Sequence, residues 1–243
     1  MAYGRVYVVQ GDDIVAVSVH DGEEDWRFRA CKQRAGEVDE DGSQLSFRVH
    51  TLATRRHVYG MAGRLLHAVD PVTGELAWVT GMQNSDRTVV ANEDIVIQAS
   101  TDDFEAVDPA TGELLWYGFA DDIYSHYALD ACRVYWTNNI HVGGLNLDTG
   151  ERDWGTEGIG HGATTPIAVT EETIFHTPGE IRLGDHPWSE SLIAYDKQTG
   201  EEKWVISEFF SGGETIVISG DENTPDTIYA GGKAIRNDGS TEI

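Results

Sequence analysis

The chain has 243 residues, 40% of them hydrophobic, which is enough for one large all-β domain or two smaller domains. Its 42 acidic and 17 basic residues give a formal net charge of −25, which disfavours nucleic acid as a partner because phosphate backbones bind basic surfaces. No apolar stretch approaches the ~20 residues of a membrane-spanning helix, so we expect no membrane span.

The acidic residues lie along the whole chain instead of in one block, and only four of the basic residues are Lys. An evenly acidic, lysine-poor composition resembles that of proteins from extreme halophiles. Self-repulsion at this net charge strains a compact fold in dilute buffer. At ~1 M salt the Debye length falls to about 3 Å and screens that repulsion. We therefore expect a halophilic, acidic protein whose fold loses stability below molar salt.

The first residues, MAYGRVYVVQGDD, hold no basic segment followed by a long apolar one, so they predict a strand and no secretory signal. The two cysteines, Cys31 and Cys132, lie far apart and form neither a disulfide framework nor a CxxC metal pair. We interpret them as two separate small core residues, although the sequence also allows a long-range disulfide.

One eleven-residue string recurs along the chain, with a turn glycine followed four residues later by Trp. In chain order the copies are AVSVHDGEEDW (residues 16–26), AVDPVTGELAW (68–78), AVDPATGELLW (106–116), GLNLDTGERDW (144–154) and AYDKQTGEEKW (194–204). A decayed sixth copy, KAIRNDGSTEI (233–243), places Ile243 at the Trp position. Because self-similarity at a fixed period indicates a repeat architecture, each copy marks one structural unit.

Short runs that alternate apolar and polar residues precede the copies, and their β-branched and aromatic content predicts strands. They are RHVYGMA (56–62), DIVIQAS (94–100), CRVYWTN (132–138), ETIFHTP (172–178) and DTIYAGG (226–232). A further short apolar run comes before them, such as RTVVA (87–91) or PIAVT (166–170). Each unit therefore has four predicted strands, and no stretch shows the 3.6-residue periodicity of a helix.

The turn glycines recur every ~38 residues, with longer intervals where residues 32–44 and 178–190 insert predicted loops. Units of this length with four strands each predict an all-β fold, a β-propeller of four-stranded blades, in which residues 1–243 form a single repeat domain. About six units are detectable, but the first lacks its first strand and the last stops at its Trp position. The ring either closes on itself or forms part of an eight-bladed ring.

The recurring residues have a structural interpretation. Glycine allows the positive φ that a tight turn requires. The Trp of each unit is predicted to lie against the turn of the next unit, with its indole N–H bound to a backbone carbonyl. The alternative, a stacking platform for a ligand, is less favoured because the indoles would be spread over every blade. The predicted docking residues are Trp26, Trp78, Trp116, Trp154, Trp204, Gly22, Gly74, Gly112, Gly150 and Gly200.

The pattern Ala-x-Asp-x-x-Thr-Gly-x-x-x-Trp resembles the tryptophan-docking repeat of the pyrroloquinoline quinone (PQQ)-type β-propellers. The resemblance covers nearly the whole chain. This family includes quinoprotein alcohol and glucose dehydrogenases, non-catalytic propellers such as the outer-membrane assembly lipoprotein, and sensor domains fused to kinases. The resemblance implies the fold strongly and the activity weakly.

The alcohol dehydrogenases of that family hold the quinone against a disulfide of adjacent cysteines, and they bind a calcium or lanthanide ion through Glu, Asn and Asp. This chain has no adjacent cysteines, and its acids form no assignable constellation. We therefore assign no catalytic, cofactor-binding or metal-binding residue. The glycine-rich segment 158–166, which contains His161, is interpreted as a connection between blades, and the acidic segments 39–42 and 220–226 as solvated loops.

The sequence thus favours a non-catalytic protein-interaction scaffold that binds a protein or peptide on a propeller face, without a cofactor. Two alternatives stay open. One is a PQQ-dependent alcohol or sugar dehydrogenase, or its remnant, which would use PQQ with calcium. The other is a sensor domain detached from a larger protein. The resemblance implies an extracytoplasmic location, but no signal supports it, so the compartment stays open.

Overall fold

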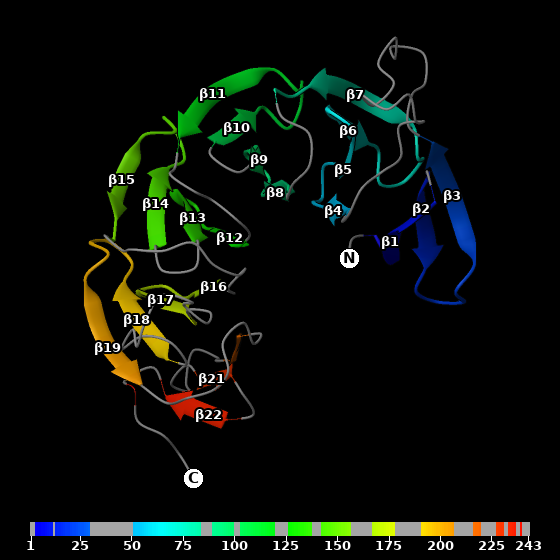
Figure 1. Cartoon of the computed structure of the whole chain (residues 1–243). Coiled ribbons are helices and arrows are strands. Elements are labelled where there is room, and N and C mark those ends of the chain that lie inside the picture. The colour runs from blue at the N-terminus through cyan, green and yellow to red at the C-terminus, as the bar shows by residue number, and fades with distance from the viewer. Residues whose placement is uncertain are drawn as a thin grey trace. The chain divides into compact units, whose positions relative to one another are not determined.

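The computed structural model describes residues 3–11, 13–29, 51–83, 89–99, 103–119, 126–137, 142–156, 167–177, 191–206, 216–219, 227–230, 233–236 and 239. These residues form six antiparallel sheets and contain no helix (Figure 1). Within these ranges there is accordingly no helix long and apolar enough to cross a membrane. The predicted all-β class is confirmed.

The first three sheets follow one another in the chain. Sheet 1 contains β1 (Arg5–Gln10), β2 (Asp13–Ser18) and β3 (Glu24–Arg29). Sheet 2 contains β4 (Leu52–Ala53), β5 (Val58–Ala62), β6 (Leu65–Val69) and β7 (Leu76–Gly81). Sheet 3 contains β8 (Val89–Ala91), β9 (Val96–Ala99), β10 (Asp103–Val107) and β11 (Leu114–Phe119).

The last three sheets repeat this order. Sheet 4 contains β12 (His126–Leu129), β13 (Arg133–Thr137), β14 (Val142–Asn146) and β15 (Arg152–Gly155). Sheet 5 contains β16 (Ile167–Val169), β17 (Thr173–His176), β18 (Leu192–Asp196) and β19 (Glu202–Ile206). Sheet 6 contains β20 (Val217–Ser219), β21 (Thr227–Ala230) and β22 (Lys233–Arg236).

The predicted unit of four strands is confirmed in sheets 2 to 5, where each strand pairs with the next one in the chain. The predicted runs become β5, β9, β13, β17 and β21, and the runs before two of them become β8 and β16. In their described parts, the first and last sheets have three strands each. Cys31, His161 and the loops predicted at 32–44, 39–42, 158–166, 178–190 and 220–226 lie outside the described residues.

The chain divides into two compact units, Met1–Gly118 and Phe119–Ile243, and each is described by itself. In the first unit, sheets 1 and 2 share one apolar cluster, which includes Tyr7, Phe28 and Val58. A second cluster, which includes Tyr59 and Val107, lies between sheets 2 and 3. The core is therefore built from sheet faces stacked on one another, as in a β-propeller.

The second unit repeats this arrangement. One apolar cluster joins Tyr135 and Val142 of sheet 4 to Ile174 and Ile193 of sheet 5. Another joins Phe175 and Leu192 of sheet 5 to Ile228 and Ile235 of sheet 6 and to Ile216, which directly precedes β20. Each such side chain stabilises the fold by about 1.5–3 kcal/mol when it is fully buried, so a sheet depends on its neighbour for stability.

The register of the strands explains why the repeated string begins with a small residue. Trp26 lies directly opposite Ala16, and Trp78 lies opposite Ala68. Trp154 and Trp204 are placed in the same way, opposite Gly144 and Ala194. In each of these four sheets the register shifts immediately after the small residue, which is the mark of a β-bulge. A small residue leaves room for the indole ring at this point of the pleat.

Candidate functional site

The acidic residues of the repeated string are used to build turns. In sheet 2, Asp70 Oδ1 accepts hydrogen bonds from the amides of Val72 (2.8 Å) and Thr73 (2.7 Å). The Gly74 amide donates to the Asp70 carbonyl over 3.0 Å and closes the turn. The Thr73 amide, with that of Val72, holds the pKa of Asp70 below its usual value. The same bonds recur at Asp108, Asp196 and Asn146.

The turn glycines all have the left-handed conformation that the sequence predicted. Their φ angles are 74° at Gly22, 74° at Gly74, 72° at Gly112, 71° at Gly150 and 74° at Gly200. L-residues with a side chain rarely adopt this region, so the requirement for glycine is conformational at every copy.

The indole of one sheet lies against the turn glycine of the next sheet. A Cβ atom added to Gly74 would lie 2.7 Å from Cδ2 of Trp26, and one added to Gly112 would lie 2.5 Å from Cε3 of Trp78. In the second unit, a Cβ atom added to Gly200 would lie 2.4 Å from Cε3 of Trp154. No side chain fits at these glycines unless the indole moves.

Two indoles also bind the next turn through a hydrogen bond. Trp26 Nε1 donates to the Pro71 carbonyl over 3.2 Å, and Trp78 Nε1 donates to the Pro109 carbonyl over 3.0 Å. The hydroxyl of Tyr7 donates to the same Pro71 oxygen over 3.1 Å, a second link that the sequence did not predict.

The remaining predicted docking residues are placed differently. Trp204 lies near Gly239, the turn glycine of the decayed sixth copy, where an added Cβ would lie 3.1 Å from Cδ2 of the ring. Trp116 is buried in the first unit, whereas Gly150 belongs to the second. Around Gly22 the described residues place no atom within 4 Å of an added Cβ.

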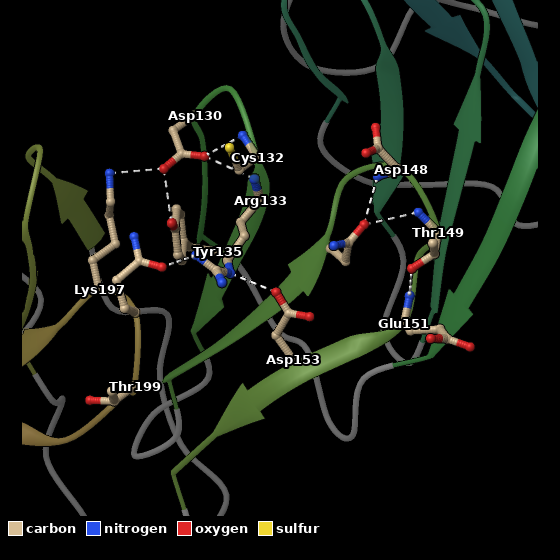
Figure 2. Close-up of polar contacts among 12 residues, drawn as sticks. Asp130, Cys132, Arg133, Tyr135, Asp148, Thr149, Glu151, Asp153, Lys197 and Thr199 are labelled. Atoms are coloured by element: carbon tan, nitrogen blue, oxygen red, sulfur yellow. Dashed lines mark hydrogen bonds and ion pairs between the residues drawn. The ribbon is translucent and has the colours of Figure 1, made fainter.

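A polar network joins sheets 4 and 5 at the turn between β12 and β13, as Figure 2 shows. Asp130 Oδ1 accepts hydrogen bonds from the amides of Cys132 (2.7 Å) and Arg133 (2.8 Å). Asp130 Oδ2 accepts a bond from the Tyr135 hydroxyl (2.9 Å) and lies 3.0 Å from Lys197 Nζ of sheet 5. Burial raises the pKa of Asp130, but these bonds outweigh burial, and the net pKa is lowered.

Arg133 extends the network in two directions (Figure 2). Its Nε lies 2.6 Å from Asp153 Oδ2, and its Nη1 donates to Gln198 Oε1 over 2.9 Å. Because the side chains of Asp130 and Arg133 already have protein partners, the network connects sheets 4 and 5. Cys132 lies in this turn as an exposed free thiol, so the prediction that both cysteines are core residues was wrong for Cys132. Cys132 lies at the tip of the turn between β12 and β13, so its side chain faces solvent.

Several ionisable groups of the first unit are buried away from this network. His67 is fully buried, and desolvation lowers its pKa to about 4, so its ring is neutral near pH 7. Asp13 is held between Arg29 (2.6 Å) and Arg27 (3.1 Å), whose side chains lower its pKa to about 2. Glu105 is also buried and accepts the Gln83 amide over 2.7 Å.

Within the described ranges, no three His, Cys, Asp or Glu residues are grouped to hold a metal ion. The sequence also lacks the adjacent cysteines against which quinoprotein alcohol dehydrogenases hold their quinone. The described residues therefore do not fit calcium and PQQ as those enzymes bind them, and we derive no catalytic step through either group.

One strand exposes large apolar side chains. Leu114, Leu115 and Phe119 of β11 keep 57%, 51% and 68% of their surface accessible. Because side chains alternate along a strand, Leu115 and Phe119 lie on one face of β11 and Leu114 on the other. We call these three exposed residues of the strand the β11 surface. In the described sheet 3, β11 lies at the edge of the sheet, and its sequence LLWYGF contains no charged residue. Natural proteins usually protect an edge strand with charges, so this edge is unprotected.

Three of the four equivalent strands carry a charged residue where β11 carries Leu115, the third residue after the turn glycine, whereas β7 carries Ala77. At that position Asp25 forms an ion pair with Arg5 (2.6 Å), and Asp153 forms one with Arg133 (2.6 Å). Lys203 donates to the Thr173 hydroxyl over 2.9 Å. This contrast was not predicted, although GELLW and GELAW differ visibly from GEEDW, GERDW and GEEKW in the sequence.

Comparisons with known proteins agree with this architecture. Residues 10–123 match a family model described as outer membrane protein assembly factor BamB. A search of curated proteins gives no match.

Solved structures that are similar to this chain include the following three. A computationally designed protein, Ika8, is 15% identical with a TM-score of 0.69, over 100% of this chain and 74% of that one. BamB from Moraxella catarrhalis is 13% identical with a TM-score of 0.52, over 98% of this chain and 86% of that one. Quinohemoprotein alcohol dehydrogenase from Comamonas testosteroni is 15% identical with a TM-score of 0.60, over 82% of this chain and 42% of that one.

These identities are low, so the structural likeness shows the fold alone, and the β-propeller prediction is confirmed. The match of residues 10–123 to the family model agrees with the resemblance to the PQQ-like repeat family.

Proposed function

We propose that this protein is a non-catalytic β-propeller scaffold that binds protein partners through its surface. The observation that carries the proposal is the β11 surface, a run of exposed apolar side chains on an edge strand of a protein with a net charge of −25. Exposed apolar side chains grouped on one edge indicate an interaction site. The match to a model named for an assembly factor is consistent with protein partners.

The repeated residues supply the rigidity that such a scaffold requires. We assign Trp26, Trp78, Trp154 and Trp204 to mechanical coupling, since each lies on the turn glycine of the next sheet. Trp116 is assigned the same role from its place in the string. The Asp residues of the string cap these turns, so the most regular polar residues are occupied by structure.

A site-specific photo-crosslinker tests the proposal. The crosslinking amino acid is placed at Leu115 in the host cell, and the matched control carries it at Val72, an equally exposed apolar residue in the turn between β6 and β7. We expect crosslinks to a defined protein from position 115 and none to that protein from position 72. Equal or absent crosslinks from both positions would refute the β11 surface as a binding site.

The dehydrogenase alternative is tested by dye-linked oxidation of alcohols and sugars with added PQQ and calcium. The scaffold proposal predicts no turnover above that of heat-denatured protein. Turnover that depends on both PQQ and calcium would replace the scaffold with an enzyme. The sensor-domain alternative is tested by the full-length gene, since continuity with a kinase domain would favour it.

We also propose that the even acidity of the surface is an adaptation to high salt. The support is the net charge of −25 combined with only four Lys residues. At this charge the compact state gains stability when salt screens its self-repulsion.

A further inference from the structure

The interface between sheets 4 and 5 lacks a bond that both interfaces of the first unit contain. Trp154 lies on the turn glycine of sheet 5, just as Trp78 lies on that of sheet 3. Trp78 Nε1 donates to the Pro109 carbonyl, whereas Trp154 Nε1 is buried and has no hydrogen-bond partner among the described residues. A buried donor without a partner destabilises a fold, so this interface requires another contact.

The residue after the first polar residue of the turn explains the difference. In sheet 3 this residue is Pro109, which has no amide hydrogen to donate. In sheet 5 it is Lys197, whose amide donates to the Glu172 carbonyl over 3.0 Å. Leu147 of sheet 4 makes the equivalent bond to the Cys132 carbonyl over 2.9 Å. The two turns that bind an indole are thus the two in which proline removes this amide bond.

Side chains of the same turn in sheet 5 supply the other contact. Lys197 Nζ lies 3.0 Å from Asp130 Oδ2 of sheet 4 (Figure 2). The next residue, Gln198, accepts a hydrogen bond from Arg133 Nη1 over 2.9 Å. In sheets 2 and 3 the same two turn positions hold Pro-Val and Pro-Ala, whose side chains have no polar group. Only the turn of sheet 5 combines a lysine with an amide side chain among these three.

The side of the interface that belongs to sheet 4 is equally distinctive. The Asp130 amide donates to the Arg133 carbonyl and closes the turn between β12 and β13. The same backbone bond closes the equivalent turns of sheets 2, 3 and 5, between Thr54 and His57, Asn92 and Ile95, and Thr170 and Thr173. None of those three turns carries a carboxylate with an arginine. Sheet 4 therefore offers an acid and an arginine where sheet 5 offers a lysine and an amide.

We infer that Asp130, Arg133, Lys197 and Gln198 form a latch that replaces the indole hydrogen bond at this interface and positions sheet 5 on sheet 4. The side chains of Lys197 and Asp130 keep only 11% and 25% of their surface accessible, so their attraction is stronger than that of an exposed pair. The latch lies in the second unit and does not depend on the proposed binding at the β11 surface.

Proton NMR of the indole N–H groups in the full chain tests the replaced bond. Each signal is assigned by its loss in the corresponding Trp→Phe variant. Trp26, Trp78 and Trp154 each pack against a Tyr of their own sheet, at ring-centroid distances of 5.7, 5.9 and 6.3 Å, so ring-current effects are similar. A hydrogen bond moves an indole proton downfield, so we expect the Trp26 and Trp78 signals downfield of the Trp154 signal.

The variant Lys197→Pro gives sheet 5 the Asp-Pro turn of sheet 3 and removes the amide bond to Glu172. The Trp154 signal should then move downfield, towards that of Trp78. The matched control is Lys203→Met, which changes another lysine of sheet 5 that binds the Thr173 hydroxyl. This control should leave the Trp154 signal in place.

A double-mutant cycle tests the latch itself. Asp130→Asn and Lys197→Met are measured singly and together by urea unfolding of the full chain, and Asn keeps the oxygen that caps the turn. If the two side chains are coupled, the double variant should unfold roughly fivefold less readily than the two single losses predict. A second cycle with Asp130→Asn and Lys203→Met should be additive, because Lys203 binds Thr173 instead.

A Trp154 signal as far downfield as that of Trp78 in the natural protein overturns the replaced bond. A Trp154 signal that does not move in folded Lys197→Pro overturns the role of proline. If that variant does not fold, the natural spectrum and the cycle decide. Additive losses for Asp130→Asn and Lys197→Met overturn the latch. The proposed function fails separately, through the photo-crosslinker at Leu115.

Discussion

The coupling of sheets through indoles predicts unequal effects of one substitution at two turn glycines. Gly22 and Gly112 have almost the same φ, 74° and 72°, and both occupy the turn position of the repeated string. Around Gly22 the described residues leave an added Cβ open, whereas at Gly112 that Cβ would lie 2.5 Å from Cε3 of Trp78. Replacement by Ala therefore separates backbone strain from displacement of the indole.

The expected losses of stability follow from the backbone strain and from the displacement of the indole. Left-handed backbone costs an Ala about 1–2 kcal/mol, so Gly22→Ala should lower the free energy of unfolding by this amount alone. Gly112→Ala bears the same strain and also displaces the ring of Trp78. Overpacking costs about 1–3 kcal/mol. If the 3.0 Å hydrogen bond from Trp78 Nε1 to the Pro109 carbonyl breaks, a further ~1 kcal/mol is lost. With the hydrogen bond broken, we expect a loss of roughly 3–6 kcal/mol for Gly112→Ala.

Urea unfolding in about 2 M KCl, where self-repulsion is screened, measures both variants by circular dichroism and Trp fluorescence. A double-mutant cycle with Trp78→Phe separates the ring from the turn, since a smaller ring should recover part of the Gly112→Ala loss. Equal losses for Gly22→Ala and Gly112→Ala, or strict additivity with Trp78→Phe, would show that the indole does not couple the sheets.

Three further predictions concern stability. Because the pKa of His67 falls to about 4 from an ordinary 6.5, the unfolded chain binds the extra proton between these values, and stability should fall as pH drops through this window. This loss in the free energy of unfolding, up to about 3 kcal/mol, should be absent when His67→Gln is unfolded with urea over the same pH range. Asp130→Ala should lower the free energy of unfolding by roughly 2–4 kcal/mol, because it removes the carboxylate that pairs with Lys197 and caps the turn. Asp130→Asn should cost less, since its amide oxygen still caps the turn; equal costs would contradict this. The melting temperature should rise between dilute buffer and about 2 M KCl, and an unchanged circular dichroism melt would contradict salt adaptation.

The features that the sequence predicted are those set by local chemistry. Each turn is closed by hydrogen bonds among neighbouring residues, such as Asp70, Thr73 and Gly74, so a short segment of sequence is enough to predict it. The alternation of the strands is equally local, and the four-strand unit follows from both. The small residue opposite each Trp is visible in the string, but its reason emerges only when the strands are paired.

The features that the sequence did not predict depend on contacts between distant segments. Asp130 looks like any acid of an acidic chain until Lys197 of the next sheet lies 3.0 Å away. Because cysteine is usually buried, Cys132 is predicted to be a core residue, but it occupies an exposed turn. The sequence alone could have indicated the β11 surface, since Leu115 stands where other copies carry Asp25 or Asp153. The exposure of Leu115, however, is a property of the folded sheet.

The central claim is that the β11 surface binds a protein partner. The photo-crosslinker at Leu115, with its matched control at Val72, tests this claim most directly. We predict crosslinks to a defined protein from position 115 and none to that protein from position 72. Equal or absent crosslinks from both positions would contradict the claim.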